Sequence, residues 1–368
     1  MKKNIKILIL DLEGSLGVST AQLLCLAKNI EVHLIVNSCT KNYPGLLSCI
    51  QHNRAFSSYD VKFLTILERL CIENSIDLLF PSNGEAIAFA IEYKNEISAF
   101  SVLPALPTMD SFQIANNKHL LSVILNENKI QQPITLLVHS KQFVEKISTQ
   151  KFPAVIKPIV DCSGGDGIKY FSSEDEMRSE LPNILESSQK MILQQFIKST
   201  DICISVFCEN GEILRYTIQQ PLINDLTKYA PALSVEFVDN KEVLSAATKL
   251  MKSLNWNGVA HIDMIKEETT NEIFVIEINP RIWGSILSSY FAGVNFPELM
   301  CRYAFGSIVA NEGYKKIQHV RLEYLKKIFQ GKLNLNNSIK ILRLRSGFFL
   351  QIKYLLNEIH HRYKKLFL

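Results

Sequence analysis

A segment in the last third of the chain combines oxygen-bearing side chains with an arginine and a tryptophan. It reads IFVIEINPRIWGS from Ile273 to Ser285, with a carboxylate at Glu277 and an amide at Asn279. Because side chains alternate along an extended strand, Glu277 and Asn279 point to the same face. Carboxylate and amide oxygens are ligands that a hard cation such as Mg²⁺ prefers. The segment therefore fits a cation site, and it equally fits an edge strand with a solvated polar face.

A third oxygen ligand stands on the preceding predicted strand. The stretch WNGVAHIDMIKEE carries Asp263, and a turn at Thr270 and Asn271 joins it to the Glu277 strand as a hairpin. On such a hairpin Asp263 lies beside Glu277 and Asn279, which makes a site with three oxygen ligands. His261, on the same strand as Asp263, is expected to be structural rather than catalytic.

Two lysines and a glycine-rich stretch can neutralise and cover a polyphosphate. Lys118 lies in the short predicted helix NNKHLLSVILNEN, and Lys157 ends the apolar strand FPAVI. The stretch SGGDG follows a few residues later, and its glycines let backbone N–H groups approach phosphate oxygens without Cβ collisions. Taken alone, SGGDG is also ordinary hairpin-turn chemistry.

The amino-terminal part alternates strands and helices, as βαβ units do. The predicted order is strand 5–10, helix from about 20 to 28, strand 31–36, helix 61–74 and strand 76–80. Gly14 and Gly17 supply only a fragment of a dinucleotide-binding fingerprint. Ser82 or Asn83 can cap the next helix, which carries Glu85 in its first turn. Their position beyond the end of a strand also makes them candidates for a substrate-facing loop.

Composition sets the outer limits. The chain has 368 residues, of which 47% are apolar and 21% charged, so it is an ordinary globular sequence long enough for two or three cores. No apolar run reaches the roughly 18 to 20 residues of a membrane span, and we expect no signal peptide and a cytoplasmic protein. The eight cysteines form no CxxC pair, which argues against a zinc ribbon and for reduced thiols.

The carboxyl-terminal tail is strongly basic. From Lys315 onward it holds 13 Lys and Arg residues against two acidic residues. Its last segment mixes apolar and basic residues at helical spacing, which is typical of a helix on an anionic membrane surface or on an acidic partner. A helical cap packed on the protein's own acidic body fits the same pattern.

The order of these segments resembles the ATP-grasp enzymes. The middle of the chain adds the stretch MILQQFI, a hairpin that turns at Asn210 and Gly211, and a helix over 241–254. With the run INPRIWGSILSSYFAGVNFPELMCRYAFG, the resemblance covers the chain from Ile5 to about Gly306. It is to the carboxylate–amine ligase type, and to carbamoyl-phosphate-synthase-like members of bacterial polysaccharide clusters.

The resemblance implies a chain of the α/β and α+β classes with the ATP-grasp fold. A Rossmann-like pre-ATP-grasp domain would span residues 1–112, and a small lid subdomain would span 113–190. A larger antiparallel-sheet subdomain with the metal site would span 191–312, and a basic helical extension would span 313–368.

The resemblance also implies an ATP site. Lys118 and Lys157 would contact the phosphates, and Asp201 would bind the ribose. The closing loop and the adenine-binding hinge would consist of Ser163, Gly164, Gly165, Asp166 and Gly167, and of Gln194, Phe196 and Ile197. The hinge usually begins with glutamate and the ribose residue is usually Glu, so Gln194 and Asp201 depart from the pattern.

The chemistry implied by the resemblance is transfer of the γ-phosphate to a carboxylate. Mg²⁺, with Mn²⁺ as the alternative ion, would be held by Asp263, Glu277 and Asn279, with Arg281 and Arg215 as catalytic residues near the transferred phosphate. An amine would then open the acyl phosphate to an amide. Two other classes remain open, which are phosphoryl transfer without an amine acceptor, kinase-like or of the carbamoyl-phosphate type, and a non-catalytic ATP-binding regulator.

Substrates and partners follow from the resemblance in outline only. The substrates would be small-molecule or carrier-linked carboxylates and amines, in cell-surface glycan or amino-acid-derivative biosynthesis. Glu85, Trp283 and Ser285 are the candidate substrate contacts. Pro280 would stop the strand, so that Arg281 and Trp283 leave the sheet and face the cleft. No nucleic acid is expected, a homodimer is left open, and the basic tail leaves open a peripheral location at the inner face of the membrane.

Overall fold

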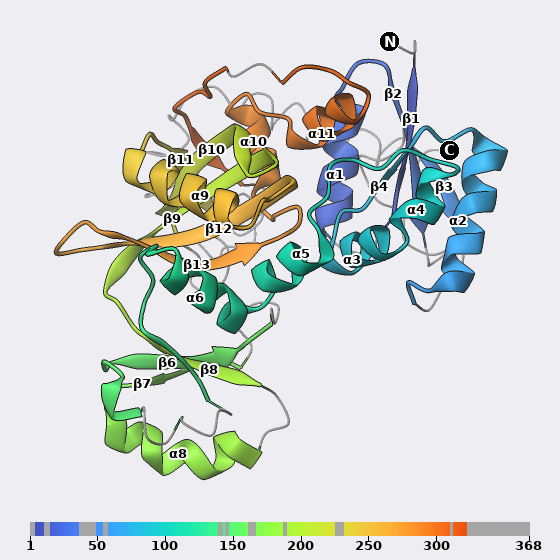
Figure 1. The fold of residues 1–368 in the computed structure, drawn as a ribbon. Helices are drawn as coiled ribbons and strands as arrows, with labels where there is room; N and C mark the ends of the chain where they lie inside the picture. The colour runs from blue at the N-terminus through green and yellow to red at the C-terminus, as the bar shows by residue number, and fades with distance from the viewer. Residues whose placement is uncertain are drawn as a thin grey trace, which may run out of the picture.

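The computed structural model describes residues 4–10, 15–36, 49–53, 58–138, 143, 147–160, 167–186, 190–224, 232–309 and 312–321. These residues are arranged around three β-sheets (Figure 1). The SGGDG stretch up to Asp166 and the predicted helical tail from residue 322 onward lie outside the described residues.

The first sheet is parallel and has the strand order β3-β2-β1-β4. Its elements are β1 (Ile5–Ile9), α1 (Ser15–Cys25), β2 (Ile30–Val36), β3 (Ile50–Asn53), α2 (Val61–Asn74) and β4 (Leu78–Phe80). The predicted βαβ pattern is confirmed, but α1 begins five residues before Thr20 and includes Gly17. Leu16 and Val18 pack against the core, which offsets the helix-weakening effect of Gly17.

Four helices lead from the first sheet to the second. They are α3 (Gly84–Glu92), α4 (Lys94–Ser98), α5 (Met109–Ala115) and α6 (Lys118–Glu127). Asn83 caps α3, as predicted, by accepting a hydrogen bond from the Ala86 N–H. Asn117 caps α6 in the same way, so that helix begins at Lys118 and holds this lysine at its amino terminus.

The second sheet is small and antiparallel, with the order β5-β8-β6-β7. Its elements are β5 (Thr135–Leu137), η1 (Ile147–Thr149), β6 (Ala154–Pro158), β7 (Lys169–Phe171), α8 (Glu174–Glu186) and β8 (Met191–Gln195). Ile156 and Leu193 from the sheet pack with Met177 from α8 in one buried cluster. Figure 1 shows this sheet and α8 at one end of the molecule, away from the first sheet.

The third sheet is the largest, with the order β13-β12-β9-β10-β11-β14. Its strands are β9 (Ser199–Glu209), β10 (Glu212–Ile223), β11 (Ser234–Phe237), β12 (Gly258–Glu267), β13 (Ile273–Asn279) and β14 (Gln318–Val320). The accompanying helices are α9 (Lys241–Ser253), α10 (Ile286–Phe291) and α11 (Phe296–Ala304). The predicted β9–β10 turn is confirmed, because Asn210 and Gly211 both have positive φ, at 48° and 79°.

One face of the large sheet is apolar and packs against α9. Ile202, Ile204 and Ile262 lie in one buried cluster with Val243 and Leu250 of α9. Residues between these on the same strands therefore point to the opposite face. That opposite face carries the polar residues of the candidate site.

The large sheet continues beyond residue 312. Strand β14 pairs antiparallel with β11, and the register sets Val235 opposite His319. Residues 318–320 were predicted as part of a helical extension, but backbone pairing with β11 makes them a strand. The predicted boundary at 312 therefore does not mark the end of the sheet.

Candidate functional site

Polar side chains lie in two rows across three neighbouring strands of the large sheet. Strand β12 pairs antiparallel with both β9 and β13. The first row consists of Cys203, Asp263 and Glu277, and the second of Ser205, His261 and Asn279. Because alternate residues of a strand share a face, all six side chains lie on the face opposite α9. The predicted placement of Asp263 beside Glu277 is confirmed by this register.

Asp263 is the centre of the two rows. Its Oδ1 accepts a hydrogen bond from the Cys203 thiol at 3.1 Å and lies 3.3 Å from His261 Nε2. Its Oδ2 accepts a hydrogen bond from Asn279 Nδ2 at 2.8 Å. Burial alone would raise the pKa of Asp263, but the neighbouring His261 and the hydrogen bonds hold that pKa below its ordinary value.

Two lysines face the same carboxylates. Lys118 Nζ, from the start of α6, lies 3.0 Å from Glu277 Oε2. Lys157, from β6 of the small sheet, is only 7% exposed. Burial lowers the pKa of Lys157 to about 8, while the Glu277 carboxylate opposes this shift and the Lys118 ammonium adds to it. The structure thus brings together groups from α6, the small sheet and the large sheet.

This arrangement suits a polyphosphate and its cation. The ammonium groups of Lys118 and Lys157 offer positive charge, and the carboxylates of Asp263 and Glu277 offer oxygen ligands. Asn279 uses its amide nitrogen toward Asp263, which leaves its oxygen for a cation. Two carboxylates and an amide oxygen are the ligand set that Mg²⁺ takes, so these residues fit the expected ion.

The predicted adenine hinge lies at the end of β8. Gln194 is buried, and its Nε2 donates a hydrogen bond to Thr135 Oγ1 at 2.9 Å. Phe196 and Ile197 follow β8, and Phe196 is 44% exposed. Tyr170 of β7 meets Phe196 edge to face, with ring centroids 5.3 Å apart. Sequence analysis did not single out Tyr170, because nothing in its strand showed that β7 and the hinge are neighbours.

Asp201 lies on a described strand, whereas most of the predicted glycine loop lies outside the described residues. Asp201 lies on β9, two residues before Cys203 and therefore on the same face. Desolvation, with repulsion from Asp263, raises the pKa of Asp201. Of the predicted closing loop, Gly167 is described and has a positive φ of 78°, which favours glycine. Ser163, Gly164, Gly165 and Asp166 lie outside the described residues.

Arg215 and Arg281 lie in different surroundings. Arg281 follows Pro280 just after the end of β13, and its Nη1 donates to the Ile282 carbonyl at 3.2 Å. Arg215 is buried on β10, pairs in register with Phe207, and donates to the Gly313 carbonyl at 3.2 Å. On β10 it stands four residues from Gln219, the partner of Cys203, which is about 13 Å along the strand.

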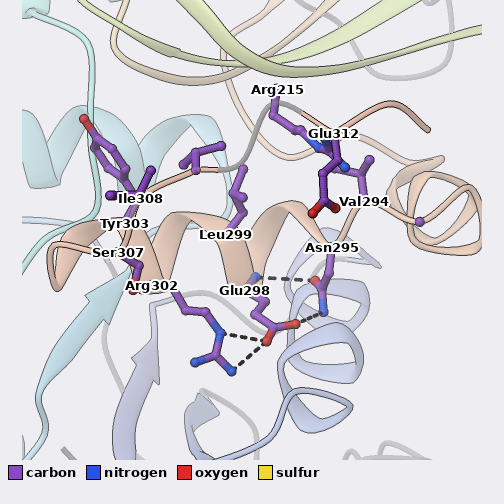
Figure 2. A pocket seen from close by; sticks show the side chains of 12 residues that line it. Arg215, Val294, Asn295, Glu298, Leu299, Arg302, Tyr303, Ser307, Ile308 and Glu312 are labelled. Carbon is purple, nitrogen blue, oxygen red and sulfur yellow. Dashed lines mark hydrogen bonds and ion pairs between the residues drawn. The ribbon is translucent and has the colours of Figure 1, made fainter. Parts of the chain in front are cut away.

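Arg215 lines a separate pocket. Figure 2 shows it above helix α11, which carries Glu298, Leu299 and Arg302. The pocket has a volume of about 260 Å³, and Asp263 is not among its lining residues. Arg215 therefore lines a pocket that Asp263 does not line, and its expected role beside the phosphate stays a prediction.

The three predicted substrate contacts are also spread out. Glu85 is exposed in the first turn of α3. Ser285 accepts a hydrogen bond from Gln219 Nε2 at 2.7 Å. Trp283 was expected to face a cleft, but it is 2% exposed, stacks on His261 and packs edge to face on Phe296. Their roles toward a substrate stay predictions.

A comparison with protein families finds a match in the middle of the chain. Residues 115–285 match the family model of the ATP-grasp domain. The chain is 25% identical over 243 residues to a carbamoyl-phosphate synthase of Methanobrevibacter smithii, an alignment that covers 62% of this chain and 64% of that protein. It is 25% identical to a D-alanine–D-alanine ligase of Carboxydothermus hydrogenoformans, over 42% of this chain and 55% of that enzyme. The chain thus spans less than two thirds of the curated relatives it matches.

Solved structures share the fold. An N5-carboxyaminoimidazole synthetase of Staphylococcus aureus in complex with ADP superposes with a TM-score of 0.69 at 16% identity, over 90% of this chain and 87% of that one. An L-amino acid ligase of Bacillus licheniformis superposes with a TM-score of 0.61 at 18% identity, over 83% of this chain and 75% of that one. The predicted ATP-grasp fold is confirmed.

Proposed function

Because residues 115–285 form an ATP-grasp domain, we propose that the protein is an ATP-dependent ligase that activates a carboxylate and joins it to an amine. The observation that carries the proposal is the meeting of Lys118 and Lys157 with Asp263 and Glu277. Phosphate-binding cations and cation-binding oxygens from separate elements converge there on one face of the large sheet.

The ion pair between Lys118 and Glu277 gives the site a resting arrangement. When ATP binds, Lys118 exchanges the Glu277 carboxylate for phosphate oxygens, which frees Glu277 for a cation. Lys157 takes up its full charge as its pKa rises beside the phosphates. Mg²⁺, when bound by Asp263, Glu277 and Asn279, would offset the negative charge on the β- and γ-phosphates.

The chemical step needs no nucleophile from the protein. A substrate carboxylate oxygen attacks the γ-phosphorus, ADP leaves, and the product is an acyl phosphate. The amine then attacks the acyl carbon and inorganic phosphate leaves. Catalysis is positioning together with stabilisation of developing charge, which Lys118, Lys157 and Arg281 supply in this proposal.

Adenine binding is assigned to the end of β8. Gln194 would accept a hydrogen bond from the adenine amino group through its amide oxygen, since its nitrogen already donates to Thr135. Phe196, Ile197 and Tyr170 would pack against the base, and Asp201 would bind the ribose. Gly167 and the stretch before it would cover the phosphates and exclude water from the acyl phosphate.

A second candidate function is activation of the carbamoyl-phosphate type, without an amine acceptor in the final step. The relatives named carbamoyl-phosphate synthase favour it, since one of them aligns over 62% of this chain. Product analysis separates the two functions, because a ligase gives an amide, whereas the alternative releases a phosphorylated product.

Substrates, partners and location belong to the proposal in their broad classes. The carboxylate and the amine are taken to be small molecules or carrier-linked groups of a surface-glycan or amino-acid-derivative pathway. The described helices include none with the length and apolar character to cross a membrane. A cytoplasmic location fits the proposed ATP requirement and the six described cysteines, none of which forms a disulfide.

The test is release of ADP by the purified protein with Mg²⁺ and ATP across pools of carboxylates, each with and without hydroxylamine to trap an acyl phosphate. Asp263→Ala is the inactive comparison, and Asp239→Ala, an exposed aspartate paired with Lys316, is the matched control. Carboxylate-dependent ADP release with a hydroxamate product supports the ligase. ATP binding without turnover in any pool, carrier-linked carboxylates included, contradicts it and supports the regulator.

A further inference from the structure

We propose that Cys203, His261 and Asp263 form a second metal site, which binds a thiophilic divalent ion such as Zn²⁺. The three residues offer one sulfur, one imidazole nitrogen and one carboxylate oxygen. These ligand atoms all lie within 4.8 Å of one another. The proposal stands on these side chains alone, and only its effect on turnover rests on the proposed function.

The two ligand distances to Asp263 lie close to those of a tetrahedral site. With the usual Zn–N and Zn–O lengths, neighbouring N and O ligands lie about 3.3 Å apart, and S and O ligands lie about 3.5 Å apart. His261 Nε2 and Asp263 Oδ1 are 3.3 Å apart, and Cys203 Sγ and Asp263 Oδ1 are 3.1 Å apart. Relative to Asp263, the thiol needs to move by only a few tenths of an ångström to make room for an ion, and its separation from His261 is at most 4.8 Å.

Hydrogen bonds already orient two of the three ligands. Ser205 Oγ lies 2.8 Å from His261 Nδ1, and if it accepts the proton of that nitrogen, the lone pair of Nε2 points toward Asp263 and Cys203. Asn279 holds the other oxygen of Asp263. Such outer hydrogen bonds fix the tautomer and the orientation of metal ligands in known sites. Trp283 stacks on the His261 ring with an interplanar angle of 11° and holds its plane.

The ion must displace a proton from Cys203. Burial and the Asp263 carboxylate raise the pKa of this thiol well above its ordinary value, so without an ion it is a thiol that donates to Asp263. When the ion binds, the S–H bond breaks, a sulfur–metal bond forms, and the proton leaves to solvent. The charge of the ion stabilises the thiolate that burial otherwise disfavours.

The site is accessible and keeps an open position. The side chain of Asp263 is 32% exposed, whereas that of His261 is 9% exposed. An ion can therefore enter from the Asp263 side. Three protein ligands leave the fourth tetrahedral position for water or for an oxygen of a bound molecule, as in sites that exchange ligands.

The consequence is competition at Asp263. This residue is also expected to hold Mg²⁺ with Glu277, and an ion on Cys203 and His261 draws the carboxylate away from Glu277. Sulfur and imidazole ligands select Zn²⁺ over Mg²⁺, so the two ions are discriminated by ligand type. Zn²⁺ at this site would lower turnover with Mg²⁺ and ATP.

The experiment is a titration of the reduced full-length protein with Co²⁺, which reports sulfur ligation by a near-ultraviolet charge-transfer band and tetrahedral geometry by strong visible bands. We expect both bands, their loss on addition of Zn²⁺, and binding weakened by at least about 100-fold in Cys203→Ala. Cys208→Ala is the matched control, because Cys208 is a buried cysteine of the same strand on the opposite face. His261→Gln tests the nitrogen ligand and replaces Cys203→Ala if that variant does not fold.

Two results would overturn the proposal. One is the absence of cobalt bands in the wild-type protein. The other is bands that persist in Cys203→Ala and vanish in Cys49→Ala, since Cys25 and Cys49 have sulfur atoms 3.1 Å apart and could hold the ion instead. Cobalt bands without ADP formation under any condition would leave the metal site standing and contradict the proposed ligase. ADP formation without cobalt bands would do the reverse.

Discussion

The two sides of Asp263 differ in the ligand atoms they present. Toward β13, Glu277 offers carboxylate oxygens and lies 3.0 Å from Lys118. Asn279 donates its amide nitrogen to Asp263 and keeps its amide oxygen for a cation. Toward β9, Cys203 offers sulfur, and on β12 itself His261 offers nitrogen. One carboxylate is therefore shared by a hard ligand set, suited to Mg²⁺ and phosphates, and a softer set, suited to Zn²⁺. The two proposals thus assign different metal chemistry to neighbouring strands that share this one carboxylate.

We call Glu277, Asn279 and Lys118 the oxygen side of Asp263, and Cys203 and His261 the sulfur side. The largest effect is expected from Glu277→Gln, which changes the oxygen side alone. Loss of this carboxylate removes a predicted cation ligand and the partner of Lys118. We expect ADP formation to fall by roughly 10²- to 10³-fold, the size of effect seen when one preorganised charged or polar group is lost from an active site. Glu272→Gln, an exposed neighbour on the same hairpin, is the control.

The cobalt spectrum sharpens this comparison. Glu277→Gln should keep the Co²⁺ bands, because Cys203, His261 and Asp263 are unchanged. If the bands disappear together with ADP formation, the two sides of Asp263 form one site, and the distinction drawn between them is wrong.

The next effect concerns Lys157, the buried cation that faces the oxygen side. Its pKa falls from 10.5 to about 8 in the folded protein. Between these pH values the unfolded chain holds more protons, so the free energy of unfolding rises as pH increases from about 8. Over this pH range the titration of Lys157 raises the free energy of unfolding by about 3 kcal/mol, at 1.36 kcal/mol for each unit of pKa shift.

Lys157→Met should abolish this rise and stabilise the nucleotide-free protein at neutral pH, while weakening ATP binding. Denaturant unfolding across pH 7 to 10, with a chelator present, measures the free energy of unfolding of both proteins. Lys151→Met, at an exposed lysine before β6, is the control. An unchanged pH dependence in Lys157→Met would show that this lysine is not held in a desolvated position.

A smaller effect is expected from Ser205→Ala on the sulfur side. The variant removes the hydrogen bond to His261 Nδ1 and keeps all three ligands. Affinity for Co²⁺ should fall by roughly 10- to 100-fold, as for other outer hydrogen bonds of metal ligands. The Michaelis constant for ATP with Mg²⁺ should stay within a few-fold. A large loss of ATP turnover with unchanged cobalt affinity would reverse the assignment of the two sides.

The smallest effect is expected at Gln194, on the small sheet away from Asp263. Gln194→Ala removes one proposed hydrogen bond to adenine, so the affinity for ATP should fall by roughly 2- to 10-fold. Gln195→Ala is the control on the same strand. Calorimetric titration with ATP and GTP measures the change, and an unchanged preference for ATP would place adenine elsewhere.

The oxygen side was predictable because its geometry is local. Asp263 and Glu277 lie on one hairpin, and Asn271 has the positive φ, at 61°, that such a turn favours. Strand alternation then sets Glu277 and Asn279 on one face. The sulfur side was not predictable, because Cys203 meets Asp263 only through the pairing of β9 with β12, across 60 positions of sequence.

Two further residues show where sequence patterns stop being informative. Trp283 follows Pro280 and was expected to face a cleft, but the chain turns back there and buries the indole between His261 and Phe296. Arg215 lies on the correct face of β10, but alternation does not give its distance along the strand from Asp263. Burial and long-range register depend on the packing of distant segments.

The most direct test of the central claim is a crystal structure of the protein with Mg²⁺ and a non-hydrolysable ATP analogue. The account predicts the terminal phosphates between Lys118 and Lys157, and the metal ion on Asp263 and Glu277. A nucleotide bound elsewhere, or phosphates without contact to either lysine, would contradict it.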